Sequence, residues 1–244
     1  MIKTTDIMGY RFYVIDGQYF PSVTSILSIR RNEVLEQWKH RLTLTQVRLI
    51  QEWISLRGTF IHYGALRTYE TDTIIQKEEP YESYNYMKVH PQMREEVRIA
   101  GQLFREFKQK YTLTPVALEK TVWSIKYGFA GTIDCLAYLY NKNNGSKTPI
   151  IADIKTSKEI YTDSLALQLA GYNLAIQMKA RKCFVLLLHP GQTTLDGVTI
   201  GRDAPYWAFQ EITPNYQGFL ELVRIFQLLK VFLLQYKEEQ ESLF

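Results

Sequence analysis

Cysteine is scarce in this sequence of 244 residues, which contains only Cys135 and Cys183. A zinc site or an iron–sulfur cluster held by four cysteines is therefore excluded. A disulfide is not expected in the cytosol, and unpaired cysteines behave as small buried hydrophobic residues. We interpret both thiols as part of the core.

Long hydrophobic runs are also missing. No apolar stretch reaches the roughly 18 residues that a membrane-spanning helix needs. The opening residues, MIKTTDIMGYRFYV, lack the basic start and the small-residue cleavage site of a signal peptide. With 46% hydrophobic and 22% charged residues, the composition is that of an ordinary folded domain. We expect a cytoplasmic protein without a membrane partner.

A large charge excess is absent too, since the formal net charge is only +4. The excess is concentrated between Arg30 and Arg67, where seven basic residues stand against three acidic ones. A basic helical face suits a polyanion such as DNA, because neutralised phosphates release their counterions. A merely solvated helix face explains the same pattern equally well.

The order of expected elements indicates an α/β fold. Asp16-Gly17 favours a hairpin turn, and PSVT at 21–24 opens a short helix. Apolar spacing through Val47, Ile50, Ile54 and Ile61 predicts helical structure over about 33–70. Residues 71–90 lose this period and are expected to form a loop. The elements expected after Pro91 are a helix over 92–110, strands near 116–125, 130–140 and 149–155, a helix over 162–180, a strand at 183–188, a strand at YWAFQEI and a helix over 216–238.

This order predicts an α-β-β-β-α-β mixed sheet flanked by helices, with a helical region at the N-terminus. We expect a single domain over 1–244. Its parts would be an N-terminal hairpin and helical DNA-binding region (1–90), a core (91–190), and a closing strand and helix (191–244).

Asp153-Ile154-Lys155 ends an apolar strand with two charges. On a strand, residues two apart share a face, so the carboxylate and the ammonium point the same way and Ile154 points into the core. Unpaired burial of charge is costly, so a structural salt bridge or a functional site must explain the pair. The second match to this pattern, at 106–108, lies in an expected helix, where residues two apart do not face each other.

Asp134 ends the motif Gly131-Thr132-Ile133-Asp134 on the preceding expected strand. Adjacent strands would bring it beside Asp153. Two close carboxylates repel each other unless a cation lies between them, so the pair predicts a Mg²⁺ or Mn²⁺ site.

Two helical motifs add further candidates. Gly58 lies one turn before His62, which allows another backbone or a nucleic acid to approach closely. Gln168 and Tyr172 share one face of the helix that follows the Asp-Ile-Lys strand. Taken alone, each of these side chains is more commonly a structural residue.

Taken together, the motifs resemble those of RecB-like nucleases of the PD-(D/E)XK superfamily. The matching motifs, in chain order, are Gly58…His62, Gly131…Asp134, Asp153…Lys155 and Gln168…Tyr172. Thr156 and Ser157 extend the third motif in the same way. The segment PSVTSIL at 21–27 is similar to the N-terminal segment of the mitochondrial genome-maintenance exonuclease and of phage relatives. The resemblance spans residues 20 to 175 and implies a PD-(D/E)XK nuclease-like core in a bacterial or phage-encoded enzyme.

The resemblance also implies roles for individual residues. His62, Asp134, Asp153 and the carbonyl of Ile154 would bind Mg²⁺ or Mn²⁺, and Lys155 would assist the attacking water. Glu119, on the strand before Asp134, matches an acidic position that is expected near the metal without binding it. The side chains assigned to DNA and to positioning of the site are Arg57, Thr156, Ser157, Gln168 and Tyr172. The family's iron–sulfur branch is excluded by the cysteine count.

The expected substrate is DNA. Tyr81, Tyr84 and Tyr86 in the expected loop are suited to stacking on unpaired bases. With the basic helical region, they favour an exonuclease that acts on ends of single-stranded DNA, with replication or recombination proteins as further partners. The alternatives are a structure-specific or restriction endonuclease, a DNA-binding module without activity, and a structural interaction protein that uses the apolar C-terminal helix.

Overall fold

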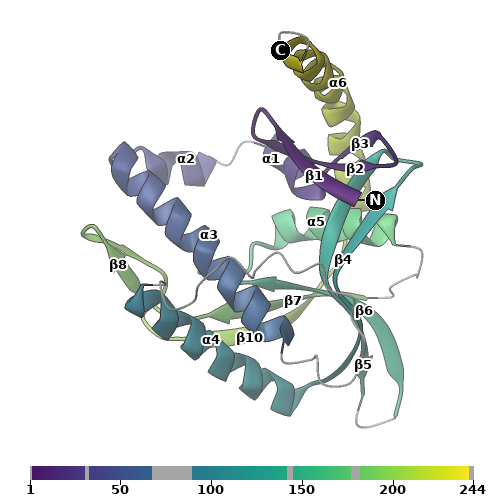
Figure 1. Ribbon diagram of the computed structural model, residues 1–244. Coiled ribbons are helices and arrows are strands. Elements are labelled where there is room, and N and C mark those ends of the chain that lie inside the picture. Colours follow the sequence, from purple (N-terminus) through teal and green to yellow (C-terminus); the bar gives the residue numbers. More distant parts are fainter. Residues whose placement is uncertain (1, 31–32, 68–89, 142–144, 177–181, 242–244) are drawn as a thin grey trace.

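A computed structural model of the protein describes residues 2–30, 33–67, 90–141, 145–176 and 182–241. Its centre is a five-stranded sheet in the order β10-β7-β6-β5-β4 (Figure 1). Only β6 and β7 are parallel, and the helix α5 connects them. The core elements are α4 (Pro91–Lys110), β4 (Thr112–Ser124), β5 (Phe129–Tyr140), β6 (Lys147–Lys155), α5 (Thr162–Ala175), β7 (Lys182–His189) and β10 (Tyr206–Ile212). The predicted α-β-β-β-α-β order and the mixed sheet are confirmed.

Hydrophobic layers cover both faces of this sheet. On β6, Ile151 belongs to a cluster formed with α5, α1 (Val23–Ser28) and α6 (Tyr216–Glu241). Its neighbours Ile150 and Ala152 belong to a second cluster formed with α4 and α3 (Leu44–Arg67). This alternation is the two-residue period of a strand buried on both faces. We call these layers the α5 cluster and the α4 cluster.

A separate three-stranded sheet precedes α1. It consists of β1 (Ile2–Ile7), β2 (Tyr10–Ile15) and β3 (Gln18–Pro21). Asp16 and Gly17 both have positive φ, at 50° and 78°, so the predicted hairpin turn is confirmed. Ser22 caps α1 by accepting a hydrogen bond from the backbone N–H of Ser25. The sequence did not predict β1.

The predicted helical stretch over about 33–70 is divided into two helices. The chain forms α2 (Glu33–Lys39) and α3, which begins after Thr43. Thr43 and Gln46 exchange hydrogen bonds between side chain and backbone N–H, a capping box that starts a new helix. Ile54 is exposed, so the buried stripe of α3 differs from the predicted one. The predicted loop over 71–90, with its three tyrosines, lies almost entirely outside the described residues.

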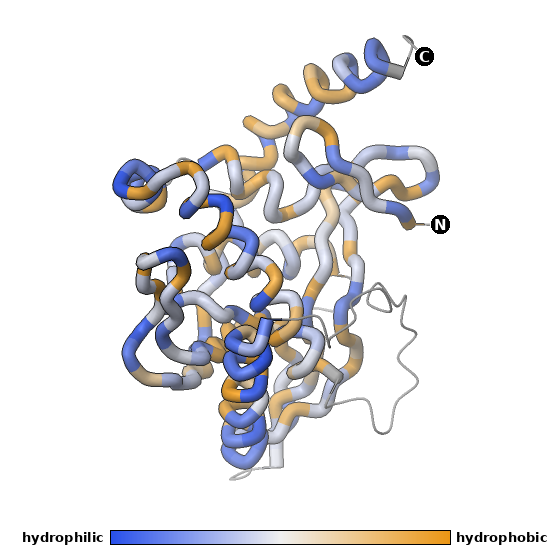
Figure 2. The backbone as a smooth tube through the Cα atoms, turned by 60° about the vertical axis from the view of Figure 1, so that its left-hand side comes forward, coloured by the Kyte–Doolittle hydropathy of each residue, from blue (hydrophilic) through white to orange (hydrophobic). Residues whose placement is uncertain are grey.

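Two further features lie outside the central sheet. A small hairpin, β8 (Thr193–Leu195) with β9 (Val198–Ile200), packs near α3 and was not predicted. The predicted closing helix is confirmed as α6, which projects beyond the body of the molecule (Figures 1 and 2). Helix α5 ends at Ala175, earlier than predicted. Among the described helices, none is long and apolar enough to cross a bilayer.

Candidate metal centre

Three side chains from three elements converge beside the central sheet. His62 comes from α3, Glu119 from β4 and Asp134 from β5, and one potential ligand atom of each lies within 4.8 Å of the others. His62 Nδ1 is 3.5 Å from Asp134 Oδ2. One imidazole nitrogen and two carboxylate oxygens are donors that suit a divalent cation with open coordination positions. We call these three residues the metal triad.

A distortion in β4 and β5 lies at this triad. Glu119 has a φ of 49°, in the left-handed region that is uncommon for residues other than glycine. Leu118 packs in the α4 cluster, whereas Val122 packs in the α5 cluster. Residues four apart in a regular strand share a face, so β4 turns over between them. Such conformations are concentrated at functional sites.

The hydrogen-bond ladder between β5 and β6 stops beside the triad. Its last pair is Cys135 with Ala152, and one residue further Asp134 Oδ2 accepts a 2.8 Å hydrogen bond from the backbone N–H of Ile154. The Asp134 side chain is therefore fixed against β6, the strand that carries the Asp-Ile-Lys motif. The Ile154 side chain is buried in the α4 cluster, as predicted. A ligand role for the Ile154 carbonyl stays a prediction.

Asp153 is the buried carboxylate of the site, with 1% of its surface exposed. Its Oδ1 accepts a 2.8 Å hydrogen bond from Gln168 Nε2. Its Oδ2 lies 2.7 Å from Lys155 Nζ in an ion pair that is not aligned as a hydrogen bond. Asp153 is not one of the three residues of the metal triad. Asp134 and Asp153 thus lie on adjacent strands, as predicted, but only Asp134 belongs to the metal triad.

The charges at the site shift one another's ionisation. Burial raises the pKa of Asp153, the Lys155 ammonium opposes this, and Asp134 adds to it. Burial lowers the pKa of Lys155, but the carboxylates of Asp153 and Asp134 outweigh it, so the pKa is raised. Desolvation, reinforced by Asp134, also raises the pKa of Glu119 although its side chain is exposed. Clustered carboxylates of this kind favour a bound cation.

Gln168 and Tyr172 support the site from within the protein. Gln168 Nε2 donates to Tyr172 Oη at 3.1 Å as well as to Asp153, and both side chains are buried. Burial, with Asp153 and Asp134 nearby, raises the pKa of Tyr172 well above its usual value, so the phenol stays neutral. A Cβ at Gly131 would lie 2.7 Å from the Tyr172 ring, so a glycine lets α5 approach β5. These contacts position Asp153 rather than reach outward to DNA.

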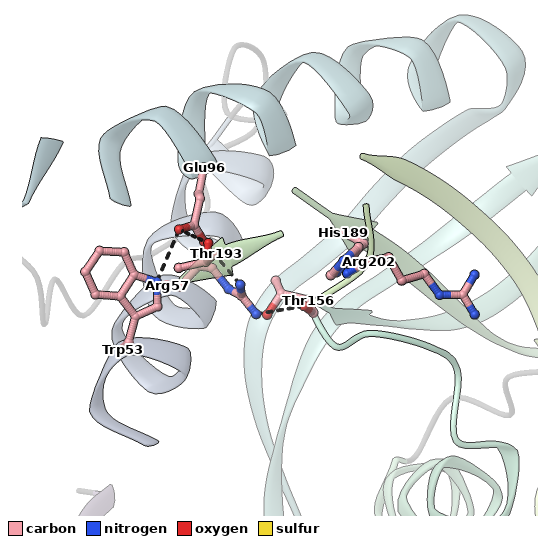
Figure 3. A network of polar contacts seen from close by, with 7 residues as sticks. All are labelled: Trp53, Arg57, Glu96, Thr156, His189, Thr193 and Arg202. Carbon is pink, nitrogen blue, oxygen red and sulfur yellow. Dashed lines mark hydrogen bonds and ion pairs between the residues drawn. The ribbon is translucent and has the colours of Figure 1, made fainter. Parts of the chain in front are cut away.

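The other predicted substrate-binding residues also point inward or lie apart from the triad. Arg57 is buried and bonded to Glu96 and to the carbonyl of Thr156, itself buried (Figure 3). Ser157 is half-buried and donates to the carbonyl of Glu159. Gly58 does not provide an unusually close approach, because a Cβ there would meet only Thr156 Oγ1 at 3.7 Å.

The sequence analysis did not predict that Glu119 is one of the three potential metal ligands, or that Glu96 forms a buried ion pair with Arg57. No sequence pattern encodes the positive φ of Glu119. A signal for Glu96 was present, since it occupies the buried stripe of α4 with Met93, Ala100 and Leu103. A charge on such a stripe indicates a buried ion pair.

Comparison with known proteins gives no family assignment, because no protein-family model and no curated protein matches the sequence.

Proposed function

We propose that the protein is a divalent-metal-dependent deoxyribonuclease, and specifically an exonuclease that acts on ends of single-stranded DNA. One observation carries the proposal. The metal triad lies directly beside an Asp–Lys pair, and a hydrogen bond from Ile154 N–H to Asp134 joins the two. A structural salt bridge explains Asp153 and Lys155 alone, but it does not explain three further ligand-type side chains beside them. The resemblance of the motifs to RecB-like nucleases of the PD-(D/E)XK superfamily supports the same function.

Different residues of the site would perform different steps of phosphodiester hydrolysis. His62, Glu119 and Asp134 would hold Mg²⁺ or Mn²⁺, and Asp153 would complete the shell if its side chain turns from Lys155. Such a cation supplies charge neutralisation at the phosphate and lowers the pKa of a bound water. The Lys155 ammonium is placed to orient that water and to share developing negative charge. Because an imidazole is among the donors, Mn²⁺ should serve at least as well as Mg²⁺.

Exposed basic residues support DNA as the substrate. Within the basic region, Arg30, Arg41 and Arg48 are exposed, whereas Arg57 is buried. Lys39 is paired with Glu36 at 2.8 Å. Among the described residues of this region, these three exposed arginines are placed to contact phosphates without reading sequence.

Labelled oligonucleotides test the function. Wild-type protein should shorten end-labelled single-stranded DNA in Mg²⁺ or Mn²⁺ and should be inactive in EDTA. Asp134→Asn should abolish cleavage, because it removes a triad carboxylate. Asp16→Asn, in the hairpin turn, is the matched control and should cleave like the wild type, since Asn also tolerates positive φ. Undiminished cleavage in EDTA or by the Asp134 variant would exclude the proposed site.

A further inference from the structure

A buried polar network joins α3, α4 and the end of β6 (Figure 3). Arg57 donates through one guanidinium nitrogen to Glu96 Oε2 at 3.1 Å and through the other to the Thr156 carbonyl at 3.2 Å. Glu96 is held in turn by Trp53 Nε1 at 3.3 Å and by the hydroxyl of Thr193. The Arg57 and Glu96 side chains are only 4% and 6% exposed. The network is closed to solvent, so Arg57 does not contact DNA.

The network acts on the backbone that follows the catalytic strand. Thr156 comes directly after Lys155, so its carbonyl lies at the point where β6 ends. Arg57 also lies on the same helix as His62, little more than one turn before it. One side chain therefore connects the helix that carries His62 to the chain segment that carries Lys155.

Stability alone does not account for this arrangement. A buried ion pair gains little over well-packed apolar residues, because the desolvation of both charges offsets their attraction. The planar arginine fork, however, holds two acceptors at a fixed separation, which a lysine cannot do. Such a fork fixes geometry, and a displacement of about 1 Å at a catalytic group costs about 100-fold in rate.

We propose that Arg57 is a positioning residue, which holds the Thr156 carbonyl and thereby sets the place of the Lys155 ammonium beside the metal triad. This inference rests on the proposed nuclease function. It differs from a substrate-binding role, since Arg57 acts through the protein backbone and touches neither metal nor DNA.

Two variants separate positioning from folding. Arg57→Lys keeps the charge beside Glu96 but cannot bond both acceptors. Arg57→Met combined with Glu96→Gln removes both charges and leaves a carbonyl oxygen for the Trp53 and Thr193 donors. Arg98→Lys is the matched control, because Arg98 makes a two-point contact with Glu95 on the same helix at the exposed surface.

Steady-state kinetics, Mn²⁺ titration and hydrogen exchange are measured on all variants. Both Arg57 variants should lose about 100-fold in kcat with little change in KM or in Mn²⁺ affinity, because only the transition-state geometry changes. Amide exchange in the segment after Lys155 should become faster in both. Arg98→Lys should match the wild type in every measurement.

Wild-type kcat in either folded Arg57 variant, or wild-type exchange in that segment, would overturn the positioning role. A rise in KM and a fall in Mn²⁺ affinity as large as the fall in kcat would also overturn it, since that combination marks general disorder of the site. If the wild-type protein itself does not cleave DNA, the nuclease proposal fails, and the exchange measurement still decides whether Arg57 fixes the Thr156 segment.

Discussion

Asp134 and Asp153 stand on neighbouring strands but have different surroundings. Asp134 is partly exposed, bonded to a backbone N–H and grouped with His62 and Glu119. Asp153 is buried and held by Gln168 and Lys155. The first carboxylate is therefore available to a cation at the surface, whereas the second is paired with Lys155. A fully buried carboxylate needs such partners, because isolated burial of a charge is costly.

Glu119 gives the sharpest residue-scale prediction about the metal. Glu119→Gln should weaken Mn²⁺ binding by about tenfold or more, since even indirect partners of a metal contribute that much. Calorimetric titration of Mn²⁺ measures the change. Glu106→Gln, on exposed α4 surface, is the control and should leave the affinity unchanged. If both variants bind Mn²⁺ like the wild type, Glu119 lies near the metal without holding it.

The burial of His189 leads us to expect that the protein loses stability at acidic pH. It is fully buried, its Nε2 accepts a hydrogen bond from the Arg202 N–H, and burial, with Arg57 and Arg202 nearby, lowers its pKa from 6.5 (Figure 3). The folded protein therefore keeps the imidazole neutral, while the unfolded chain takes up a proton below about pH 6.5. This contribution to stability is present above that pH and is lost as the pH falls, at up to about 1.4 kcal/mol per pH unit.

His189→Gln removes this titration and keeps an acceptor for the Arg202 N–H. Its free energy of unfolding in urea should fall less between pH 7.5 and 5.5 than that of the wild type. His40→Gln, at an exposed position, is the control and should keep the wild-type slope. Parallel curves for the wild type and the His189 variant would show that another group sets the acid limit.

At the scale of elements, the sequence predicted what depends on periodicity. The α-β-β-β-α-β order follows from alternating helical and apolar strand patterns, and the charged end of β6 marked Asp153 and Lys155 correctly as neighbours. The sequence pattern of a capping box at Thr43 and Gln46 indicated the break between α2 and α3. The apolar period alone did not show this break. Strand β1 was missed because its sequence, IKTTDI, is mostly polar and lacks a regular apolar alternation.

The site depends on features that periodicity does not encode. The position of Glu119 in the triad comes from a local reversal of β4, and the inward direction of Arg57 comes from its partner Glu96 on another helix. Both are tertiary effects. Arg57 nevertheless lies on the buried stripe of α3 with Ile50, Trp53 and Ile61, so the spacing favoured an interior position over a DNA contact.

The reversal of β4 can be tested with glycine and alanine. At a positive φ, alanine is strained and glycine is not, so Glu119→Gly should be more stable than Glu119→Ala by about 1 kcal/mol. Lys120, the next residue, does not have a positive φ and should show the opposite order, by about 0.5–1 kcal/mol. Urea unfolding of the four variants in EDTA measures both differences. The same order at both positions would contradict the left-handed conformation of Glu119.

At the scale of the whole molecule, the metal triad joins α3, β4 and β5, and the hydrogen bond from Ile154 N–H to Asp134 links it to β6, which carries the Asp–Lys pair. The α4 cluster and the α5 cluster cover the two faces of that sheet. The candidate site is thus built on strands and on one long helix, and the Arg57 network joins that helix to the end of β6. Sites on such elements keep their geometry better than sites on loops.

The proposed exonuclease function predicts that a free DNA end is required. Contacts from Arg30, Arg41 and Arg48 would follow phosphates without reading bases, so the choice of cleavage point would come from the end and not from sequence. Linear single-stranded DNA should therefore be degraded in Mn²⁺, whereas the same strand closed into a circle should survive. Because binding rests on phosphates, the logarithm of kcat/KM should fall linearly with the logarithm of salt concentration, with a slope of about −0.7 per phosphate contacted. Replacement of Arg48 by Gln should make that slope shallower, and Asp134→Asn serves as the inactive control for both substrates. Rapid cutting of the circle by the wild-type protein would exclude the exonuclease and favour a structure-specific endonuclease that uses the same metal centre.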